Sequence, residues 1–475
     1  SLPNGLSIIS STETLLPFSL RSIDRSLISS NYIMDYTGGT AEADHLCVLV
    51  HGLWGNPNHM AQIAKSLRTK YSADKLYLLL AKRNSGSFTY DGIERGGERV
   101  CAEIEEELRL IAERGGKITK LSIVGYSLGG LVSRYAVGLL HSKGVLDNLE
   151  CMNFTTFATP HLGVRTPLRG WHNHLWNVLG ARTLSMSGRQ LFTIDDFRGT
   201  GRPLLAVLAD PNSIFLAGLK RFKRRTLYTN IVNDRSAVHY TTGIAKTDPY
   251  TNLDNIKVNY VEGYEEVILD PDHPVGPRPK VAGPATLSSV AAAGLKWIQR
   301  IPFIVAITVF VPIGIVAFLM NSVVQTVRSS KRIQLHEKGL AGVAIEEYRG
   351  PLWMKEIREE VEHVYETLNS SQDQEYLGTE TDEDDDPAAV EMDRSTTQLL
   401  ARERRMSVPS QPTLALAPYQ FQMIQNLDSV GWHKYPVWIH KDRHSHAAII
   451  VRWEKESFSE GRVVLRHWLT EEFVV

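Results

Sequence analysis

The chain has 475 residues, with 52 Lys and Arg against 53 Asp and Glu, so its formal net charge is −1. Binding to nucleic-acid phosphates normally leaves a cationic excess or a basic stripe, so this balance argues against a nucleic-acid partner. Cys47, Cys101 and Cys151 are too few and wrongly spaced for a disulfide framework or a zinc site, which indicates a reducing compartment. No apolar segment follows a basic start, so we expect no secretory signal in this sequence.

Five apolar runs in the first half of the chain lack polar alternation, which is typical of strands buried on both faces of a parallel sheet. They cover residues 46–50, 76–81, 121–124, 152–157 and 226–232. Helical periodicity lies between them over 57–70 and 95–114, and a helix rich in small residues should run from residue 127 to about residue 140. This alternation predicts an α/β fold whose mostly parallel sheet carries helices on both faces.

Residues 163–225 interrupt this order with aromatic side chains in a loop-and-helix insertion. Such a segment suits a lid and a groove for an acyl chain, although aromatic residues at helical spacing are more often ordinary core. The large apolar residues concerned are Trp171, Trp176, Leu191, Phe192, Phe215 and Phe222. We therefore expect residues 1–250 to form a core domain with a lid-like insertion over 163–225.

The second half of the chain is less uniform. Residues 251–350 should hold a Pro-rich linker and a membrane-associated segment over 301–327, because residues 301–320 carry no charge. Flanking cations, with Pro312 and Gly314 at the midpoint, favour a hairpin that enters and leaves lipid on one side, and the alternatives are a bent interfacial helix and a buried core helix. Residues 351–412 should be an acidic helix and a disordered insertion, and 413–475 should return to the core domain.

The strongest sequence feature is Gly125-Tyr-Ser127-Leu-Gly129, which follows a predicted strand and precedes a predicted helix. A serine on such a turn is held in a strained backbone conformation, and small neighbours let the turn pack closely while the hydroxyl faces outward. The N-terminus of the following helix favours developing negative charge. Ser127 is therefore the predicted nucleophile, with a plain glycine-rich helix start as the alternative.

Nucleophilic serine chemistry also needs hydrogen-bond donors for the oxyanion. His51-Gly52-Leu53-Trp-Gly55 follows the first predicted strand, and its glycines allow the backbone to approach the nucleophile. The backbone N–H groups of Leu53 and Leu128 are the predicted oxyanion hole, with an ordinary glycine turn as the alternative. This chemistry requires no cofactor and no metal, and the pair His172 and His174 has no acidic or cysteine partner at ligand spacing.

Five short motifs carry a resemblance to known proteins. They are His51-Gly-Leu-Trp-Gly, Gly125-Tyr-Ser-Leu-Gly-Gly130, Ala158-Thr-Pro-His-Leu-Gly163, Asn233-Asp-Arg-Ser-Ala-Val238 and His446-Ala-Ala-Ile-Ile. Together they resemble a fungal family of serine esterases and lipases with the α/β-hydrolase fold, which includes lipid-droplet phospholipases. The resemblance is dense over residues 46–240 and thin in the C-terminal part. It implies an α/β-hydrolase core with its catalytic residues in the order Ser, Asp, His along the chain.

Asp234 is the predicted acid of this triad. It follows the last of the predicted strands, where a carboxylate can reach across to an imidazole, although an Asn-Asp turn would place an aspartate there too. Asp195, Asp196 and Asp210 lie in the insertion and are poorer candidates.

The resemblance implies that His446, which precedes an apolar run, is the general base. His440 and His444 are nearby alternatives, and His161 is expected to be structural. His446 lies 212 positions beyond Asp234, so the residues between them must include insertions if the two side chains serve one site. A single membrane span between them would separate these side chains, which also favours a segment that returns to the same side.

These features predict a serine lipase associated with a lipid surface. The resemblance points to acyl esters of glycerolipids as substrates, with phospholipids first and monoacylglycerols second. The alternatives are an acyltransferase or thioesterase with the same triad and a catalytically silent membrane adaptor. We expect the chain to lie on a lipid droplet or membrane surface facing the cytosol, or alternatively on the endoplasmic reticulum membrane, and the sequence names no protein partner.

Overall fold

The computed structural model describes residues 36–164, 185–277, 320, 322–340 and 416–475, apart from the single positions 235, 252, 254, 255 and 265. The predicted acidic helix and insertion over 351–412, residues 301–319 of the membrane-associated segment, and the pair His172 and His174 lie outside these residues. Within the described part, no helix is long and apolar enough to cross a membrane, so nothing there supports the expected inserted segment.

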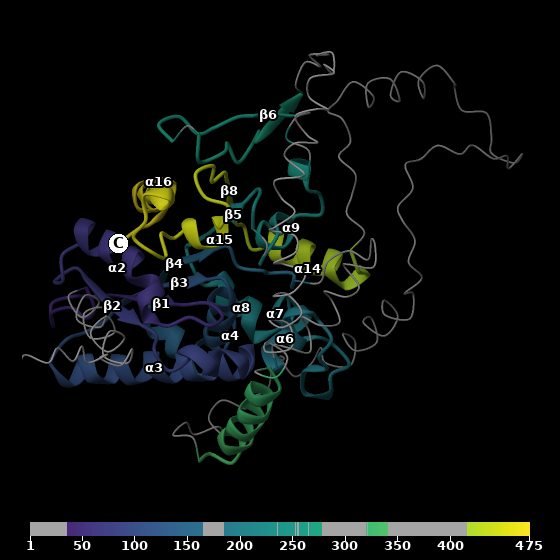
Figure 1. The fold of residues 1–475 in the computed structure, drawn as a ribbon. Helices are drawn as coiled ribbons and strands as arrows, with labels where there is room; N and C mark the ends of the chain where they lie inside the picture. Colours follow the sequence, from purple (N-terminus) through teal and green to yellow (C-terminus); the bar gives the residue numbers. More distant parts are fainter. Residues whose placement is uncertain are drawn as a thin grey trace, which may run out of the picture.

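A six-stranded parallel sheet forms the centre of the molecule, with the strand order β2-β1-β3-β4-β5-β8 (Figure 1). The strands are β1 (His45–Val50), β2 (Leu76–Leu80), β3 (Lys120–Tyr126), β4 (Glu150–Phe157), β5 (Arg224–Asn230) and β8 (His433–Val437). The first five correspond to the five apolar runs, and β8 comes from the C-terminal part of the chain. The predicted α/β-hydrolase fold with a parallel sheet is thereby confirmed.

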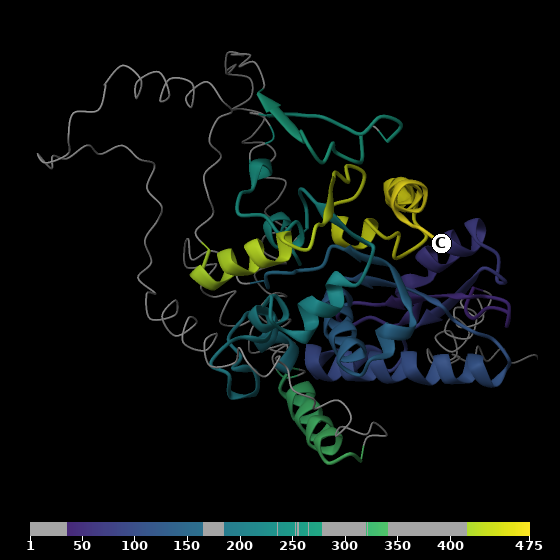
Figure 2. The same cartoon turned by 180° about the vertical axis from the view of Figure 1, so that it is seen from behind.

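Helices cover both faces of this sheet, as Figures 1 and 2 show from opposite sides. One face carries α3 (Ile93–Glu113), α4 (Leu128–Ser142), α8 (Ile214–Lys220) and α14 (Pro418–Asp428), which share one apolar core cluster. The other face carries α2 (Ala61–Lys70) and α16 (Ser459–His467), which share a second cluster. The helix predicted over 57–70 begins with the 3₁₀ turn η1 (Pro57–Met60), because Pro57 suits a first helical turn but not a helix interior.

The described part of the 163–225 insertion packs against the sheet helices. It contains α6 (Ser185–Leu191) and α7 (Leu204–Leu208) in addition to α8. Leu191, Phe192, Phe215 and Phe222 are buried there, so these side chains are core residues and do not line a groove. Trp171 and Trp176 lie outside the described residues.

Smaller elements complete the site side of the fold. They are the 3₁₀ turn η2 (Gly86–Tyr90) before α3, the short helices α9 (His239–Thr242) after β5 and α15 (Ser445–Ala448) after β8, and an antiparallel pair formed by β6 (Ile256–Val258) and β7 (Val275–Pro277). Because β1, β3, β5 and β8 all run in the same direction, the loops that follow them meet at one edge of the sheet.

Candidate active site

Ser127 occupies the turn between the end of β3 and the start of α4, with φ 54° and ψ −127°. A side chain other than glycine in this region is strained, by about 1–3 kcal/mol, and must be held by its surroundings. The neighbouring glycines show how tightly the turn packs. A Cβ atom at Gly125 would lie 2.4 Å from Cα of Gly130, and one at Gly129 would lie 2.2 Å from the carbonyl oxygen of Val50. The spacing of the serine motif is therefore a packing requirement.

Three side chains from distant parts of the chain form one line of contacts at this turn. The hydroxyl of Ser127 lies 3.0 Å from Nε2 of His446. The other ring nitrogen of His446, Nδ1, lies 2.8 Å from Oδ2 of Asp234. The structure thus brings together the three residues that the sequence predicts as nucleophile, base and acid.

The carboxylate of Asp234 is buried, and both of its oxygens accept hydrogen bonds. Its Oδ1 accepts the backbone N–H groups of Ser236, at 3.0 Å, and Ala237, at 2.8 Å, and its Oδ2 accepts the Asn230 side-chain amide at 3.0 Å. Burial alone would raise the pKa of this carboxyl, but the adjacent His446 imidazole and the hydrogen bonds outweigh it and hold the pKa below its usual value. Asp234 is therefore ionised beside the imidazole, and the Asn-Asp turn supplies donors that stabilise this state.

His446 lies on α15, and two hydrogen bonds fix its backbone. The hydroxyl of Ser445 donates to the Val232 carbonyl at 2.9 Å, and the hydroxyl of Tyr126 donates to the His446 carbonyl at 2.9 Å. Strand β8 lies beside β5 in the sheet, so the loop after β8 arrives next to Asp234 despite the 212 intervening positions. Sequence reasoning missed these supports. Tyr126 lies within the serine motif and could have been considered, whereas Asn230 and Ser445 carry no sequence signal.

The predicted oxyanion hole lies against the nucleophile. A Cβ atom at Gly52 would lie 2.7 Å from Cβ of Ser127, so the turn that carries Leu53 approaches the serine as closely as a glycine permits. Leu128 begins α4, where the first backbone N–H groups have no acceptor within the helix. Gly55 is equally restricted, because a Cβ atom there would lie 2.6 Å from the Gly52 carbonyl oxygen.

The two alternatives to His446 make other contacts, and the other two histidines of the motifs are buried. Nε2 of His440 lies 2.8 Å from the Glu266 carbonyl oxygen. His444 precedes α15, and its backbone N–H donates to Asp442. His161 is buried between Arg134 and Thr156, and burial together with the Arg134 charge lowers its pKa far below the usual value. Burial also lowers the pKa of His51, which is therefore neutral beside the Gly52 carbonyl.

The competing aspartates support local turns. Asp195 accepts the N–H of Leu204, Asp196 accepts that of Gly201, and Asp210 pairs with Arg202 at 2.7 Å. In the part of the chain that the structure describes, no group of three or more acidic, histidine or cysteine side chains is placed to hold a metal ion.

Comparison with known proteins finds a family model that matches part of the chain. The model of the family described as "Putative serine esterase (DUF676)" matches residues 40–247. The match covers less than half of the chain and is a similarity of this region. The matched residues include Ser127 and Asp234, whereas His446 lies beyond them and joins the site through the fold.

Two curated fungal proteins are similar over the same region. "Putative lipase ROG1" of Saccharomyces cerevisiae is 30% identical over 211 residues, which cover 43% of this chain and 29% of that protein. "Putative lipase C4A8.10" of Schizosaccharomyces pombe is 26% identical over 229 residues, which cover 47% of this chain and 29% of that protein. The matches therefore span less than a third of these relatives. A solved "Lipase-esterase related protein from Clostridium acetobutylicum" is 12% identical with a TM-score of 0.26, over 43% of this chain and 82% of that one.

Proposed function

We propose that this protein is a serine hydrolase that cleaves carboxylic esters through Ser127, His446 and Asp234. The observation that carries the proposal is the continuous contact from the Asp234 carboxylate through the His446 imidazole to the Ser127 hydroxyl. The strained serine turn and the match of residues 40–247 to a family model of serine esterases support it independently.

In the first half of the reaction, Nε2 of His446 takes the hydroxyl proton while Oγ of Ser127 bonds to the ester carbonyl carbon. Asp234 holds the proton of the imidazole on Nδ1, so that Nε2 is free to accept, and stabilises the imidazolium that forms. The backbone N–H groups of Leu53 and Leu128 donate to the oxyanion. When the carbon–oxygen bond to the alcohol breaks, the imidazolium returns the proton to the leaving oxygen.

In the second half, water takes the place of the alcohol. His446 accepts a proton from the water, whose oxygen attacks the acyl-serine carbonyl, and the collapse of this intermediate frees the fatty acid and restores the Ser127 hydroxyl. An acyltransferase would use the same residues but would admit an alcohol at this step.

The proposed substrates are acyl esters of glycerolipids, with phospholipids first and monoacylglycerols second. The similarity to two fungal proteins that are named as lipases supports a lipid substrate. We propose that the protein acts at the cytosolic surface of a lipid droplet or membrane.

The test is labelling of the full chain by a fluorophosphonate probe, followed by product analysis with phosphatidylcholine and monoacylglycerol dispersions. We expect the probe to label the chain and Ser127→Ala to abolish both labelling and fatty-acid release. Ser133→Ala is the matched control, because Ser133 is also a buried serine and lies on α4, the helix that follows Ser127. The control should be labelled like the original chain.

Each other outcome contradicts a stated part of the proposal. A folded chain that is not labelled at Ser127 would exclude both the hydrolase and the acyltransferase and would favour the silent adaptor. Transfer of the acyl group mainly to an added alcohol would replace the hydrolase by an acyltransferase. Fatty-acid release from monoacylglycerol but not from phosphatidylcholine would exclude the phospholipid assignment.

A further inference from the structure

The helix over 322–337 has its polar side toward the protein and its apolar side outward. Ser329 and His336 on this helix are fully buried. The outward side carries the apolar stripe, which we define as four side chains that are 46–67% exposed, namely Met320, Val323, Val324 and Val327. Surface helices normally bury such a stripe, because it recurs at three- and four-residue spacing on one face. The part of the chain that the structure describes therefore leaves the apolar stripe largely uncovered.

The polar side of the helix is held by two carboxylates with no solvent exposure, Asp91 and Glu98. The hydroxyl of Ser329 donates to Asp91 at 2.7 Å, and Nη2 of Arg332 donates to the same carboxylate at 2.8 Å. Nε2 of His336 lies 2.6 Å from Glu98. Because a buried carboxylate is costly without partners, these contacts fix the helix to the core and set which side faces outward.

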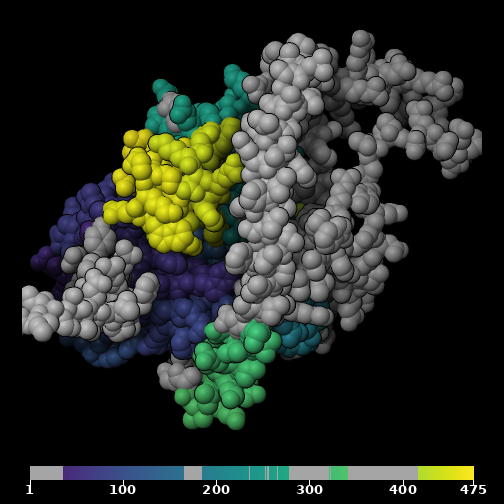
Figure 3. Space-filling model, viewed as in Figure 1, coloured from purple at the N-terminus to yellow at the C-terminus, as the bar shows by residue number. Residues whose placement is uncertain are grey.

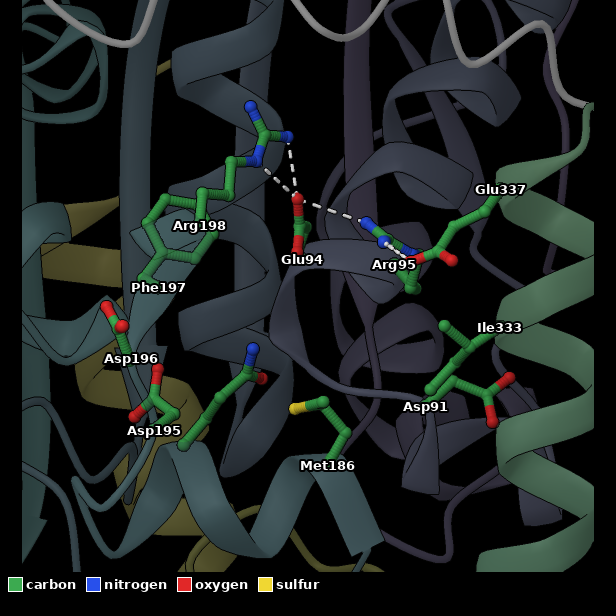
Figure 4. Close-up of a pocket in the computed structure, with 11 residues that line it drawn as sticks. Asp91, Glu94, Arg95, Met186, Asp195, Asp196, Phe197, Arg198, Ile333 and Glu337 are labelled. Carbon is green, nitrogen blue, oxygen red and sulfur yellow. Dashed lines mark hydrogen bonds and ion pairs between the residues drawn. The ribbon is translucent and has the colours of Figure 1, made fainter. Parts of the chain in front are cut away.

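The same contacts attach the helix to the support of the active site. In Figure 4, Glu337 reaches from this helix to Arg95 of α3, at 2.8 Å. Asp91 directly follows η2, whose last residue, Tyr90, accepts a hydrogen bond from the Trp54 indole N–H at 2.6 Å. Trp54 adjoins Leu53, whose N–H is part of the proposed oxyanion hole. The helix and the oxyanion turn are therefore parts of one hydrogen-bonded assembly.

The outward side changes in character along the helix. The apolar stripe occupies the N-terminal turns, where the uncharged sequence 301–320 ends, whereas the later turns carry Arg328, Lys331 and Lys338 with one exposed apolar side chain, Leu335. An apolar surface with cations beside it is the arrangement of segments that rest in anionic lipid, where the apolar side chains enter the boundary and the cations meet headgroups. Figures 1 and 3 show this helix, in green, standing out from the body of the hydrolase.

We propose that the apolar stripe contacts the surface of an anionic phospholipid layer and that the helix over 322–337 fixes the orientation of the active site on that surface. The lipid nature of the contact rests on the proposed function, whereas the exposure of the stripe does not. In this arrangement the N-terminal turns enter the lipid boundary, Lys331 lies at the headgroups, and the last turns remain with the hydrolase.

The test places an environment-sensitive fluorophore on single cysteines of the full chain. Val327→Cys reports on the apolar stripe, and Gln334→Cys is the matched control, since it lies on the same outward side seven residues later. Cys47, Cys101 and Cys151 are buried, so the label should go to the introduced thiol, and the unsubstituted chain measures the background. Vesicles of equal parts phosphatidylcholine and phosphatidylserine are compared with vesicles of phosphatidylcholine alone.

We expect a blue shift and protection from iodide quenching at position 327 with the anionic vesicles, a smaller effect with neutral vesicles, and aqueous behaviour at position 334. An aqueous label at position 327 on protein that sediments with the vesicles would overturn the proposal, because lipid contact would then be made elsewhere. Absence of vesicle binding, or equal protection at both positions, would also overturn it. A shift at position 327 that depends on protein concentration without vesicles would identify a second copy as the partner instead.

Hydrolysis of a soluble short-chain ester by the unsubstituted chain is measured in parallel. Lipid contact at position 327 without ester hydrolysis would count against the proposed function alone. Hydrolysis by protein that sediments with the vesicles but has an aqueous label at position 327 would count against this inference alone.

Discussion

Asp234→Asn exchanges one carboxylate oxygen for an NH₂ group, and the structure determines which one. Because Oδ1 accepts the backbone N–H groups of Ser236 and Ala237, the amide oxygen must take its place. The NH₂ group then faces Nδ1 of His446, where Oδ2 now lies at 2.8 Å. A donor at this position places the imidazole proton on Nε2 and removes the acceptor for the Ser127 hydroxyl. We expect kcat to fall by about 10⁴-fold, which corresponds to about 5 kcal/mol of transition-state stabilisation.

The assay is steady-state hydrolysis of a soluble ester, with thermal unfolding to show that the variant is folded. Asp196→Asn is the control, because Asp196 is an exposed aspartate that accepts one backbone N–H in the insertion. It should retain the original kcat. If Asp234→Asn were folded and lost less than about tenfold in kcat, the argument that Asp234 fixes the His446 tautomer would be refuted. Asp234 would then only stabilise its own turn.

Three further predictions concern stability. Gly129→Ala should lower the free energy of unfolding by about 1–3 kcal/mol, because the new Cβ would lie 2.2 Å from the Val50 carbonyl oxygen, and an unchanged melting temperature would contradict this. Arg332→Leu removes a charged donor from buried Asp91 and should cost about 1–3 kcal/mol in urea unfolding, with Lys331→Leu as a nearly neutral control. Burial and the nearby Lys120 lower the pKa of His45 to about 4, so below pH 6.5 the unfolded chain takes up a proton that the folded chain refuses. His45 alone should therefore lower the stability by about 1.4 kcal/mol per pH unit as the pH falls from 6.5 to 4, and His45→Gln should reduce the slope of the profile by this amount.

The strands were predictable because their pattern is local. An uninterrupted apolar run such as 46–50 can satisfy its backbone only by pairing and its side chains only by burial on both faces, and β1 has no exposed residue. The strand β8 was not predicted, since His433–Val437 mixes polar residues with a proline at an edge of the sheet. Such a strand is selected by its pairing with β5, and the sequence of the strand alone does not show this.

The residues of the site differ in how well the sequence predicts them, because some depend on a local pattern and others on distant contacts. Ser127 lies in a turn that requires glycines at positions 125 and 129. These positions are close together in the chain, so the pattern is visible in the sequence. His446 was assigned through resemblance, and its place beside Asp234 depends on the neighbouring strands β5 and β8. The aromatic residues of the insertion illustrate the opposite case. Their composition suited a lid, but Phe215 packs on α4 against Gly138, where a Cβ atom would lie 2.2 Å from the Phe215 ring.

By itself, the sequence determined the alternation of buried strands and helices, the nucleophile and the chemistry that its neighbours allow, because strand burial and a glycine-bounded turn are visible in adjacent residues. Only the tertiary structure decided which imidazole and carboxylate reach that serine, and that the helix over 322–337 turns its apolar stripe outward. Those outcomes depend on contacts between residues that are far apart in the sequence, such as Asp91 with Arg332. No local sequence pattern shows which two residues will form such a pair.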